Sequence, residues 1–391
     1  MPPIVSILGI EGFEVEDIHG INPVFFKVRY PLAGSCVHCQ GPDLRLKDTF
    51  YRQIRHESLG TRTVYLYLRT HKYLCRACGR YFNDRFPGIL PYRRSTQAFR
   101  KEVFQSHYDG VCQKTLSERL LIGQASVERF YRDMLERKLS ELQNNPCPRV
   151  LGIDEHFFTR KEGYATTLCD LGKRRVYDVV LGRSEKSLER TLDGLLEREK
   201  VRVVVMDLSE TYRAICKRYF PSAKVVADRF HVIRLVNHHF LKVWQSIDPE
   251  GRKNRGLLSL MRRHENKLDP LQKRRLFQYF ERLPALRVIW EFKQRLVQLL
   301  LVKRKTKREC RGLVPFYLQY VRQLKESAFE PFKTLGTTLE NWSEEIVRMW
   351  RFTKSNGITE GFHNKMELIK RRAYGFRNFE NYRLRVRALC A

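Results

Sequence analysis

Three acidic residues stand at places where the sequence changes from one expected element to the next. Asp154 ends the apolar segment that begins "RVLGI", Asp207 follows "VRVVVM", and Glu360 lies at the head of an expected helix in "SNGITEGFHNK". Carboxylate oxygens are the ligands that Mg²⁺ and Mn²⁺ prefer. Three carboxylates from separate elements can hold two such ions about 3.5–4 Å apart and support in-line displacement at phosphorus. These residues predict metal-dependent phosphoryl transfer without a covalent protein nucleophile.

Four cysteines form a second candidate metal site. They occur as "CVHC" (Cys36 and Cys39) and "CRAC" (Cys75 and Cys78). The Cys-x2-Cys spacing lets both thiolates of a pair reach one tetrahedral Zn²⁺, and four thiolates leave no open position, so a structural zinc ion is predicted. Gly79 follows the second pair, where a tight turn is expected. Alternating apolar residues in "TRTVYLYLRTHKYL" predict a strand leading into that turn.

The charge balance indicates a polyanionic partner. The 391 residues carry 74 Lys and Arg against 43 Asp and Glu, a net charge of +31. Nucleic acid is the first candidate partner and an anionic membrane surface the second. The longest apolar stretch, "LVQLLLV" from Leu296, is too short to span a bilayer, and the N-terminal residues lack the basic region of a signal peptide. We therefore expect a cytoplasmic protein whose ten cysteines are reduced.

Two small domains are expected before the acids. Residues 1–92 read as a zinc-binding β module and 93–147 as a helix-turn-helix domain. In the latter, a helix capped by Ser95 precedes a second helix, a turn at Ile122–Gln124 and a third helix, a pattern that a plain helical hairpin also shows. "NNPCPRV" (144–150) is an expected linker, because two prolines do not continue a helix. The residues of the third helix that could face a DNA groove are Ser126, Glu128, Arg129 and Arg132.

An α/β pattern follows from 148 to 235. Three strands, a capped helix at 184–198, a strand, a helix and a strand are the order of a ribonuclease-H-like fold. In that order the first and fourth strands are neighbours, so Asp154 and Asp207 are expected to lie together. Asp170 is a less well placed rival because it ends the second strand. Asp228 and His231, in "ADRFHV", are expected near the site; we favour a strand-capping role for Asp228 over positioning of a metal-bound water.

Residues 236–350 read as a basic helical insertion, and 351–391 as the last part of the α/β domain. Between Gly251 and Cys310 there are eighteen Lys and Arg against five Asp and Glu, which favours phosphate contact. The final helix, from about Thr359, is expected to pack an apolar face on the sheet and to hold Glu360 near the strand ends. That apolar face comprises Phe362, Met366, Ile369 and Ala373. The basic residues expected to hold DNA phosphates are Lys365, Lys370, Arg371, Arg372 and Arg377.

The motifs together resemble one family over nearly the whole chain. The Cys-x2-Cys pairs, "GIDEH", "VMDLSETYR", "ADRFHV" and "SNGITEGFHNKMELIKRRAYGFRN" are similar to those of the DDE transposases of bacterial insertion sequences, in the ISL-three family. The resemblance implies that Asp154, Asp207 and Glu360 bind catalytic Mg²⁺ or Mn²⁺. It implies cleavage at transposon ends and strand transfer into target DNA, with the N-terminal modules recognising terminal inverted repeats. It also implies a nucleoid-associated protein that acts on DNA as a homodimer or a larger assembly.

Two other hypotheses fit parts of the sequence. One is a non-catalytic zinc and helix-turn-helix DNA-binding regulator derived from a transposase, although the intact acids argue against it. The other is a structure-specific nuclease or resolvase that cuts junctions or hybrids without joining ends. Substitution of Asp154, Asp207 and Glu360 separates the regulator from the two enzymes, since only the enzymes need these carboxylates.

Overall fold

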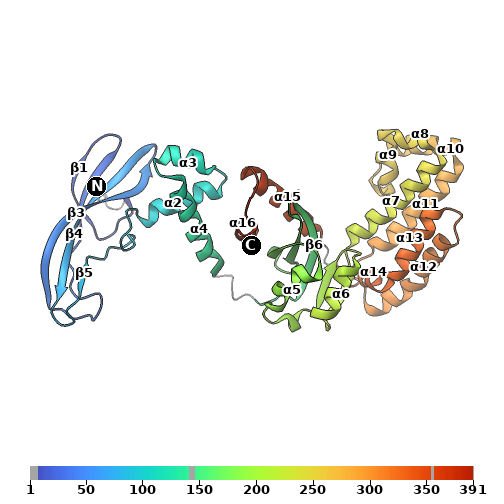
Figure 1. The fold of residues 1–391 in the computed structure, drawn as a ribbon. Helices are drawn as coiled ribbons and strands as arrows, with labels where there is room; N and C mark the ends of the chain where they lie inside the picture. The colour runs from blue at the N-terminus through green and yellow to red at the C-terminus, as the bar shows by residue number, and fades with distance from the viewer. Residues whose placement is uncertain (1–7, 141–145, 354–355, 391) are drawn as a thin grey trace. The chain divides into compact units, whose positions relative to one another are not determined.

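The computed structural model describes residues 8–140, 146–353 and 356–390. The chain divides into two compact units, Met1–Lys138 and Leu139–Ala391 (Figure 1). Within the described ranges, no helix combines the length and the apolar character needed to cross a membrane. Residues 144 and 145 of the expected linker, and Ser355 of the final motif, lie outside these ranges.

The first unit begins with a five-stranded sheet. Its order is β1-β2-β4-β3, with β5 paired to β4. The alternating side chains of Val64, Leu66 and Leu68 on β4 are fully buried, at 0% exposure, which confirms the strand predicted there. They pack with β2 residues in the core on one face of the sheet. The strands are β1 (Glu14–His19), β2 (Val24–Arg29), β3 (Leu44–Leu59), β4 (Arg62–Cys75) and β5 (Tyr81–Asn83).

Three helices complete the first unit: α2 (Gln97–Tyr108), α3 (Gln113–Leu120) and α4 (Gln124–Ser140). The predicted cap of α2 was one residue early, because Thr96 accepts the backbone N–H of Phe99 while Ser95 Oγ accepts from Arg100. The turn between α3 and α4 begins at Leu121, whose φ of 53° is left-handed. The three helices share a small apolar core.

The second unit is built on a mixed five-stranded sheet of order β10-β9-β6-β7-β8. β6, β9 and β10 run parallel, whereas β6, β7 and β8 form an antiparallel meander. The order of three strands, helix, strand, helix and strand is as predicted. The elements are β6 (Val150–Thr159), β7 (Gly163–Asp170), β8 (Arg175–Leu181), α5 (Glu185–Asp193), η1 (Arg198–Lys200), β9 (Val203–Met206), α6 (Glu210–Tyr219) and β10 (Lys224–Ala227).

Two predicted element boundaries in this part of the chain were wrong, one of a helix and one of a strand. The helix expected at 184–198 is capped by Ser184 but ends at Asp193, with Gly194 at its C-cap. The first strand does not end at Asp154, because β6 stays paired with β7 as far as Thr159. Hydrophobic periodicity predicts the presence of a helix or strand more reliably than the residue at which it ends.

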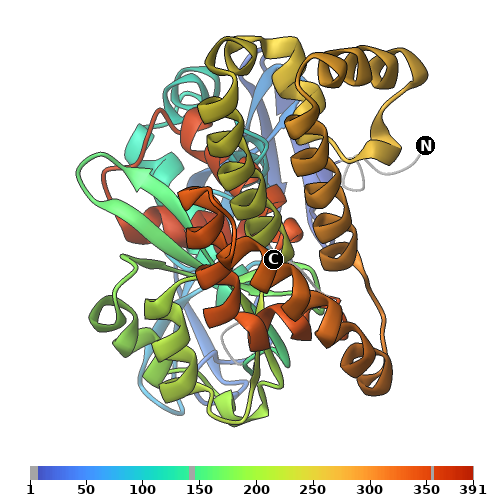
Figure 2. The ribbon, with the colours of Figure 1, turned by 90° about the vertical axis from the view of Figure 1, so that its right-hand side faces the viewer.

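A helical region follows β10 and packs against the same core. It starts at α7, which begins directly after β10 and therefore earlier than predicted. Figures 1 and 2 show α7 and α11 running side by side, and both contribute buried residues to the core of the sheet. The second half of α7, together with α9, α10 and part of α11, forms a separate apolar cluster around Trp244 and Trp290. The helices are α7 (Arg229–Ile247), α8 (Pro249–Lys253), α9 (Arg255–Arg262), η2 (Glu265–Lys267), α10 (Pro270–Arg282), α11 (Pro284–Leu301), α12 (Lys307–Lys325), α13 (Glu330–Asn341) and α14 (Ser343–Arg348).

Two helices close the second unit, α15 (Gly357–Arg372) and α16 (Phe379–Leu389). The predicted apolar face of α15 is confirmed: Met366 and Ile369 are buried, and Phe362 and Ala373 are partly buried. This face turns towards the core of the sheet and places the first turn of α15 near β6.

Candidate functional site

Asp154 and Asp207 emerge at the same level from neighbouring strands. The parallel pairing of β6 with β9 ends at Ile153 and Met206, and each acid is the next residue. Because parallel strands point their carboxyl ends to the same edge, the two side chains are brought together as expected. Asp154 is only 6% exposed.

His231 joins the two acids from the first turn of α7. Ligand atoms of Asp154, Asp207 and His231 all lie within 4.8 Å of one another. His231 Nε2 is 3.2 Å from Asp207 Oδ1, but that oxygen is buried and makes no hydrogen bond within the described residues. A buried carboxylate oxygen without a partner is costly, and a divalent cation would satisfy it. The set of donors fits a hard metal ion.

The electrostatics of the site also favour a cation. Burial, reinforced by nearby acids such as Asp228, raises the pKa of Asp154 to about 7. Burial and the charge of Asp154 raise the pKa of Asp207 to about 8. Burial lowers the pKa of His231. The negative charge of the clustered carboxylates exceeds the positive charge around them, so their pKa values are raised. Binding of a cation would therefore favour the ionised carboxylates.

Glu360 lies at the rim of this group. It is exposed in the first turn of α15, and it is outside the close group formed by Asp154, Asp207 and His231. Its charge nevertheless helps to raise the pKa of Asp154 and opposes the lowering of the His231 pKa. The structure thus brings two predicted acids into contact distance and holds the third beside them.

Asn356 fixes the start of α15 against the sheet. The side chain is 2% exposed, and its Nδ2 donates to the Ile153 carbonyl at 3.0 Å. The backbone N–H of Asn356 donates to Asp228 Oδ1 at 3.1 Å. Gly152 makes this approach possible, because a Cβ there would stand 2.6 Å from Asn356 Oδ1. The contacts determine where the α15 helix, and Glu360 with it, begins.

Asp228 and Asp170 have local structural roles. Asp228 is 1% exposed at the N-cap of α7 and accepts the Asn356 N–H, so it joins the end of β10 to the start of α15. Asp170 accepts the backbone N–H groups of Gly172 and Lys173 in the turn after β7. Because β7 is antiparallel to β6 and pairs Asp170 with Leu151, Asp170 lies away from the acid cluster.

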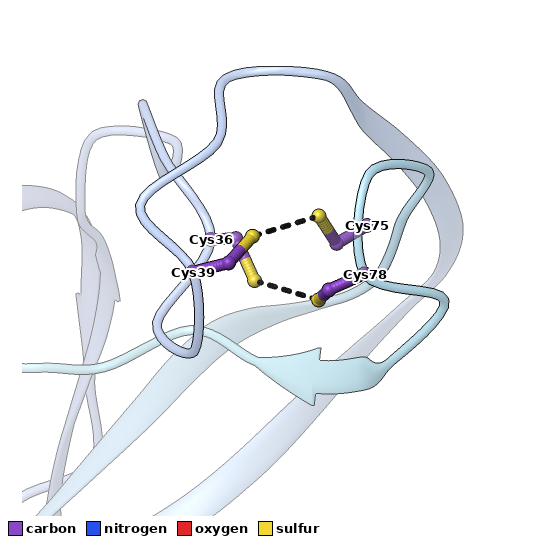
Figure 3. A group of neighbouring side chains, drawn as sticks. All are labelled: Cys36, Cys39, Cys75 and Cys78. Carbon is purple, nitrogen blue, oxygen red and sulfur yellow. Dashed lines mark hydrogen bonds between the residues drawn. The ribbon is translucent and has the colours of Figure 1, made fainter.

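The four cysteines of the two Cys-x2-Cys pairs converge on one point (Figure 3). The sulfurs of Cys36 and Cys78 are 3.7 Å apart and those of Cys39 and Cys75 are 3.5 Å apart, far beyond a disulfide bond. Zinc–sulfur bonds of about 2.3 Å in a tetrahedron require sulfur separations of about 3.8 Å. The four thiols therefore fit a structural zinc ion.

The two knuckles around these sulfurs have matching backbones. The N–H groups of Gln40 and Gly79, each four residues after the first cysteine of its pair, donate to the carbonyls of Cys36 and Cys75. Both residues have positive φ, 61° and 70°. The tight turn predicted at Gly79 is confirmed, and its counterpart uses a glutamine in the same conformation.

Two family models match this chain. A transposase family model of the ISL3 DDE type matches residues 151–386. The zinc-finger model of the transposases IS204/IS1001/IS1096/IS1165 matches residues 33–78, which include all four cysteines. The chain belongs to the ISL3 transposase family. The family membership predicted from the motifs is therefore confirmed.

Two curated proteins are similar to this ISL3-family chain. The transposase for insertion sequence element IS1001 of Bordetella parapertussis is 22% identical over 364 residues, which are 90% of this chain and 88% of that protein. An ATP-dependent protease of Lactococcus lactis subsp. lactis is 35% identical over 57 residues, only 15% of this chain and 18% of that protein. The second match is local and carries no argument about the whole chain.

A buried polar network backs the acid cluster and was not predicted. His363, on α15, places Nδ1 3.9 Å from Asp154 Oδ2, and its Nε2 hydrogen-bonds with Thr167 Oγ1 at 3.1 Å. His156 connects Thr167 to the hydroxyl of Tyr382 on α16. Burial lowers the pKa of His363 to about 4, so the ring is neutral near pH 7. The signal available was the pair of histidines in "GIDEH" and "EGFHNK", which only the fold brings together.

The basic residues expected to contact DNA fall into two groups. Lys365 and Lys370 turn towards the protein: the Lys365 ammonium donates to the Leu389 carbonyl, and Lys370, 12% exposed, donates to the Phe157 carbonyl at 2.7 Å. The other five are exposed or partly exposed. On α4, Ser126 Oγ accepts from Arg129, and Arg132 pairs with Glu136; Arg371, Arg372 and Arg377 are exposed at the end of α15 and beyond.

Gly152→Ala tests how tightly the α15 start is held. The new Cβ would clash with Asn356 Oδ1 and lie 2.9 Å from the Leu171 side chain. We expect the substitution to destabilise the second unit by about 1–3 kcal/mol. All four tryptophans lie in this unit, so urea unfolding followed by tryptophan fluorescence reports it. Gly194→Ala is the control, since its nearest contact would be an ordinary 3.5 Å; equal midpoints for both variants would contradict the packing described.

Proposed function

We propose that this ISL3-family chain is the DNA transposase of an insertion sequence. It would bind the terminal inverted repeats, cleave DNA strands at the element's ends and transfer them into target DNA. The observation that carries the proposal is the convergence of Asp154, Asp207 and His231 at the end of the β6–β9 pair, with Glu360 beside them. Crowded carboxylates with raised pKa values at one sheet edge are suited to metal-dependent phosphate chemistry.

The fold supports this proposal. The strand order β10-β9-β6-β7-β8, with an antiparallel meander and two parallel crossovers, is the arrangement expected of a ribonuclease-H-like domain. We assign that domain to 148–228 and 351–391, and the helical insertion to 229–350, because α7 begins at Arg229. Before that domain, 1–92 would be the zinc-binding module and 93–147 a helix-turn-helix domain. The tight turn after α3 supports the latter reading.

Each acid has a distinct task in the proposed reaction. Asp154 and Asp207 are rigid ligands, because adjacent strands fix both backbones. Glu360 is the exposed third ligand, and its place on α15 depends on the bonds of Asn356. When bound, Mg²⁺ or Mn²⁺ would activate a water or a 3′-hydroxyl and stabilise the leaving oxygen. His231 would hold Asp207 in position or add a nitrogen ligand to the same site.

DNA contact is assigned to exposed basic side chains. Ser126, Arg129 and Arg132 on α4 would read or position the inverted repeat. Arg371, Arg372 and Arg377 would contact phosphates near the acids. Lys365 and Lys370 bond to carbonyls of the protein itself, so we assign them to anchoring α15. Joining two ends to a target requires two copies of the chain at least, so a homodimer on DNA is proposed.

The regulator hypothesis predicts no chemistry at all. A protein that only bound DNA would gain nothing from a buried Asp207 oxygen left without a hydrogen-bond partner, which costs stability. The nuclease hypothesis shares the site but predicts cutting without joining.

The discriminating experiment uses DNA carrying both ends of the insertion sequence that flanks this coding region, together with a target plasmid. With Mg²⁺ we expect cleavage at the ends and covalent joining to the plasmid, and with EDTA neither product. Joined products would reject the regulator and the nuclease. Cleavage without joining at every condition would favour the nuclease, and no metal-dependent product would overturn the proposal.

A further inference from the structure

One side of α7 carries an exposed stripe that the proposed reaction does not use. Phe230, Arg234, His238 and Lys242 follow one another at four-residue spacing and are all exposed. Residues four apart lie on one face of a helix. The stripe begins beside His231, where the Phe230 ring meets the histidine ring edge-to-face at 5.5 Å. It therefore starts at the candidate active site and runs along the helix away from it.

Two cavities of about 590 Å³ each lie along this side of α7. Ile233, Asn237 and Arg262 line both, so the cavities form one continuous groove between α7 and the α9–η2 segment, with residues of α11 along part of it. Figure 1 shows α9 beside the far half of α7. Among the described residues, no acidic side chain lines either cavity. The basic residues that line the groove are Arg234, His238, Lys242, Arg252, Arg262, Arg263, His264, Lys267 and Lys293.

Two buried donors in the groove have no acceptor within the part of the chain that the structure describes. They are Arg252 Nε and His264 Nε2, on a residue that lines one cavity and a residue that lines the other. His264 Nδ1 accepts the N–H of Asn266, so Nε2 carries the ring proton. Buried donors are normally paired, and leaving one unpaired costs about 1–3 kcal/mol. Unpaired donors on groove residues favour an acceptor-rich ligand, such as a phosphate group.

The length and chemistry of the groove fit a nucleic-acid backbone. From Phe230 to Gln245 the helix rises about 22 Å, the length of about six nucleotides of one strand in B-form DNA. Aliphatic side chains such as Ile233 and Leu241 form part of the lining and basic groups the rest. At the end nearest the acids, Phe230 contacts His231, so the stripe begins next to the acid cluster.

We propose that the groove between α7 and α9–η2 binds the phosphodiester backbone of one DNA strand as it leaves the acid cluster. The inference rests on the proposed function, because it takes the strand held at the acids to be DNA. It assigns the DNA contact of the basic insertion to one defined surface, the groove, rather than to its net positive charge.

The test compares two double variants of the full chain that remove the same charge. Lys242→Ala with Arg262→Ala neutralises the groove, and both side chains are exposed. Arg308→Ala with Arg311→Ala neutralises exposed residues of α12 that line neither cavity. Affinity for a fluorescent 30-base-pair duplex is measured across a series of salt concentrations by anisotropy. Each lost phosphate contact should reduce the slope of log affinity against log salt by about 0.9.

In the groove variant we expect the slope of log affinity against log salt to fall by about 1.8 and the affinity to fall at least tenfold. In the α12 variant we expect each of these losses to be less than half as large. The variant Lys242→Arg with Arg262→Lys keeps both positive charges and should retain the wild-type slope. Unchanged tryptophan fluorescence would show that the variants fold. Equal losses in the two Ala variants, or no loss in the groove variant, would overturn the proposal. The binding result would support the groove proposal even if the chain did not cut DNA, because the measurement does not depend on cleavage.

Discussion

Cys75→Ser is expected to remove zinc and unfold the end of the β3–β4 hairpin. Cys75 is fully buried at the end of β4, and its sulfur is 3.5 Å from that of Cys39. A structural zinc site contributes about 10–16 kcal/mol of binding free energy that is also folding free energy. The small apolar cluster around these knuckles has few other residues to replace that contribution. We expect bound zinc to fall from about one ion per chain to almost none, with thermal unfolding of the first unit at a lower temperature.

Cys112→Ser is the matched control for this change. Cys112 lies in the same unit, at the N-cap of α3, where its sulfur accepts from Thr115. Serine is a good N-cap residue, so the variant should keep its zinc and its stability. The tryptophans report only the second unit and should be unchanged in both variants. Full zinc content in Cys75→Ser would show that the four sulfurs do not hold the metal.

Asp207→Asn is expected to abolish DNA cleavage while leaving the fold intact. The amide has nearly the shape of the carboxylate but none of its charge, so the metal loses one of its two clustered aspartate ligands. We expect cleavage to fall by about 10²–10³-fold, the order found when a central electrostatic contact is removed from an active site. DNA affinity should change less than about twofold. Glu210→Gln removes the same charge from an exposed residue three positions later and should cut DNA normally.

The pH dependence of stability without metal can be predicted for the wild-type chain and for this variant. The pKa of Asp207 is raised by burial to about 8, above its ordinary value, so the folded state binds more protons than the unfolded state between pH 4 and 8. The wild-type chain therefore loses stability as pH rises through this range. Asp207→Asn should flatten that loss and be the more stable protein at pH 8 without metal. Urea midpoints in EDTA at pH 5 and pH 8 measure this; a wild-type chain more stable at pH 8 would contradict the burial argument.

Local spacing made much of this architecture predictable. Both zinc knuckles and the Gly79 turn follow from short motifs whose geometry depends on a few neighbouring residues. The adjacency of Asp154 and Asp207 follows from element order, because parallel strands of that order must be neighbours. The apolar face of α15 follows from helical periodicity.

Other features depend on long-range packing that no local pattern records. His231 reaches Asp207 because α7 starts directly after β10, and the sequence contains no local signal for the distance between them. Lys370 looks like a surface base in the sequence, but its ammonium is held by a β6 carbonyl more than two hundred residues away. Gly152 appears as one residue of an apolar strand until Asn356 is packed against it. These three contacts determine how precisely the candidate site is built.

The central claim is that Asp154, Asp207 and Glu360 together hold the divalent ions that act on DNA. Anomalous diffraction from crystals of the chain bound to DNA and soaked in Mn²⁺ tests it most directly. We predict manganese peaks bound by carboxylate oxygens of all three residues, next to a DNA phosphate, and their loss in Asp207→Asn. Manganese bound without Asp154 and Asp207, or Glu360 turned away from a fully occupied metal site, would contradict the account.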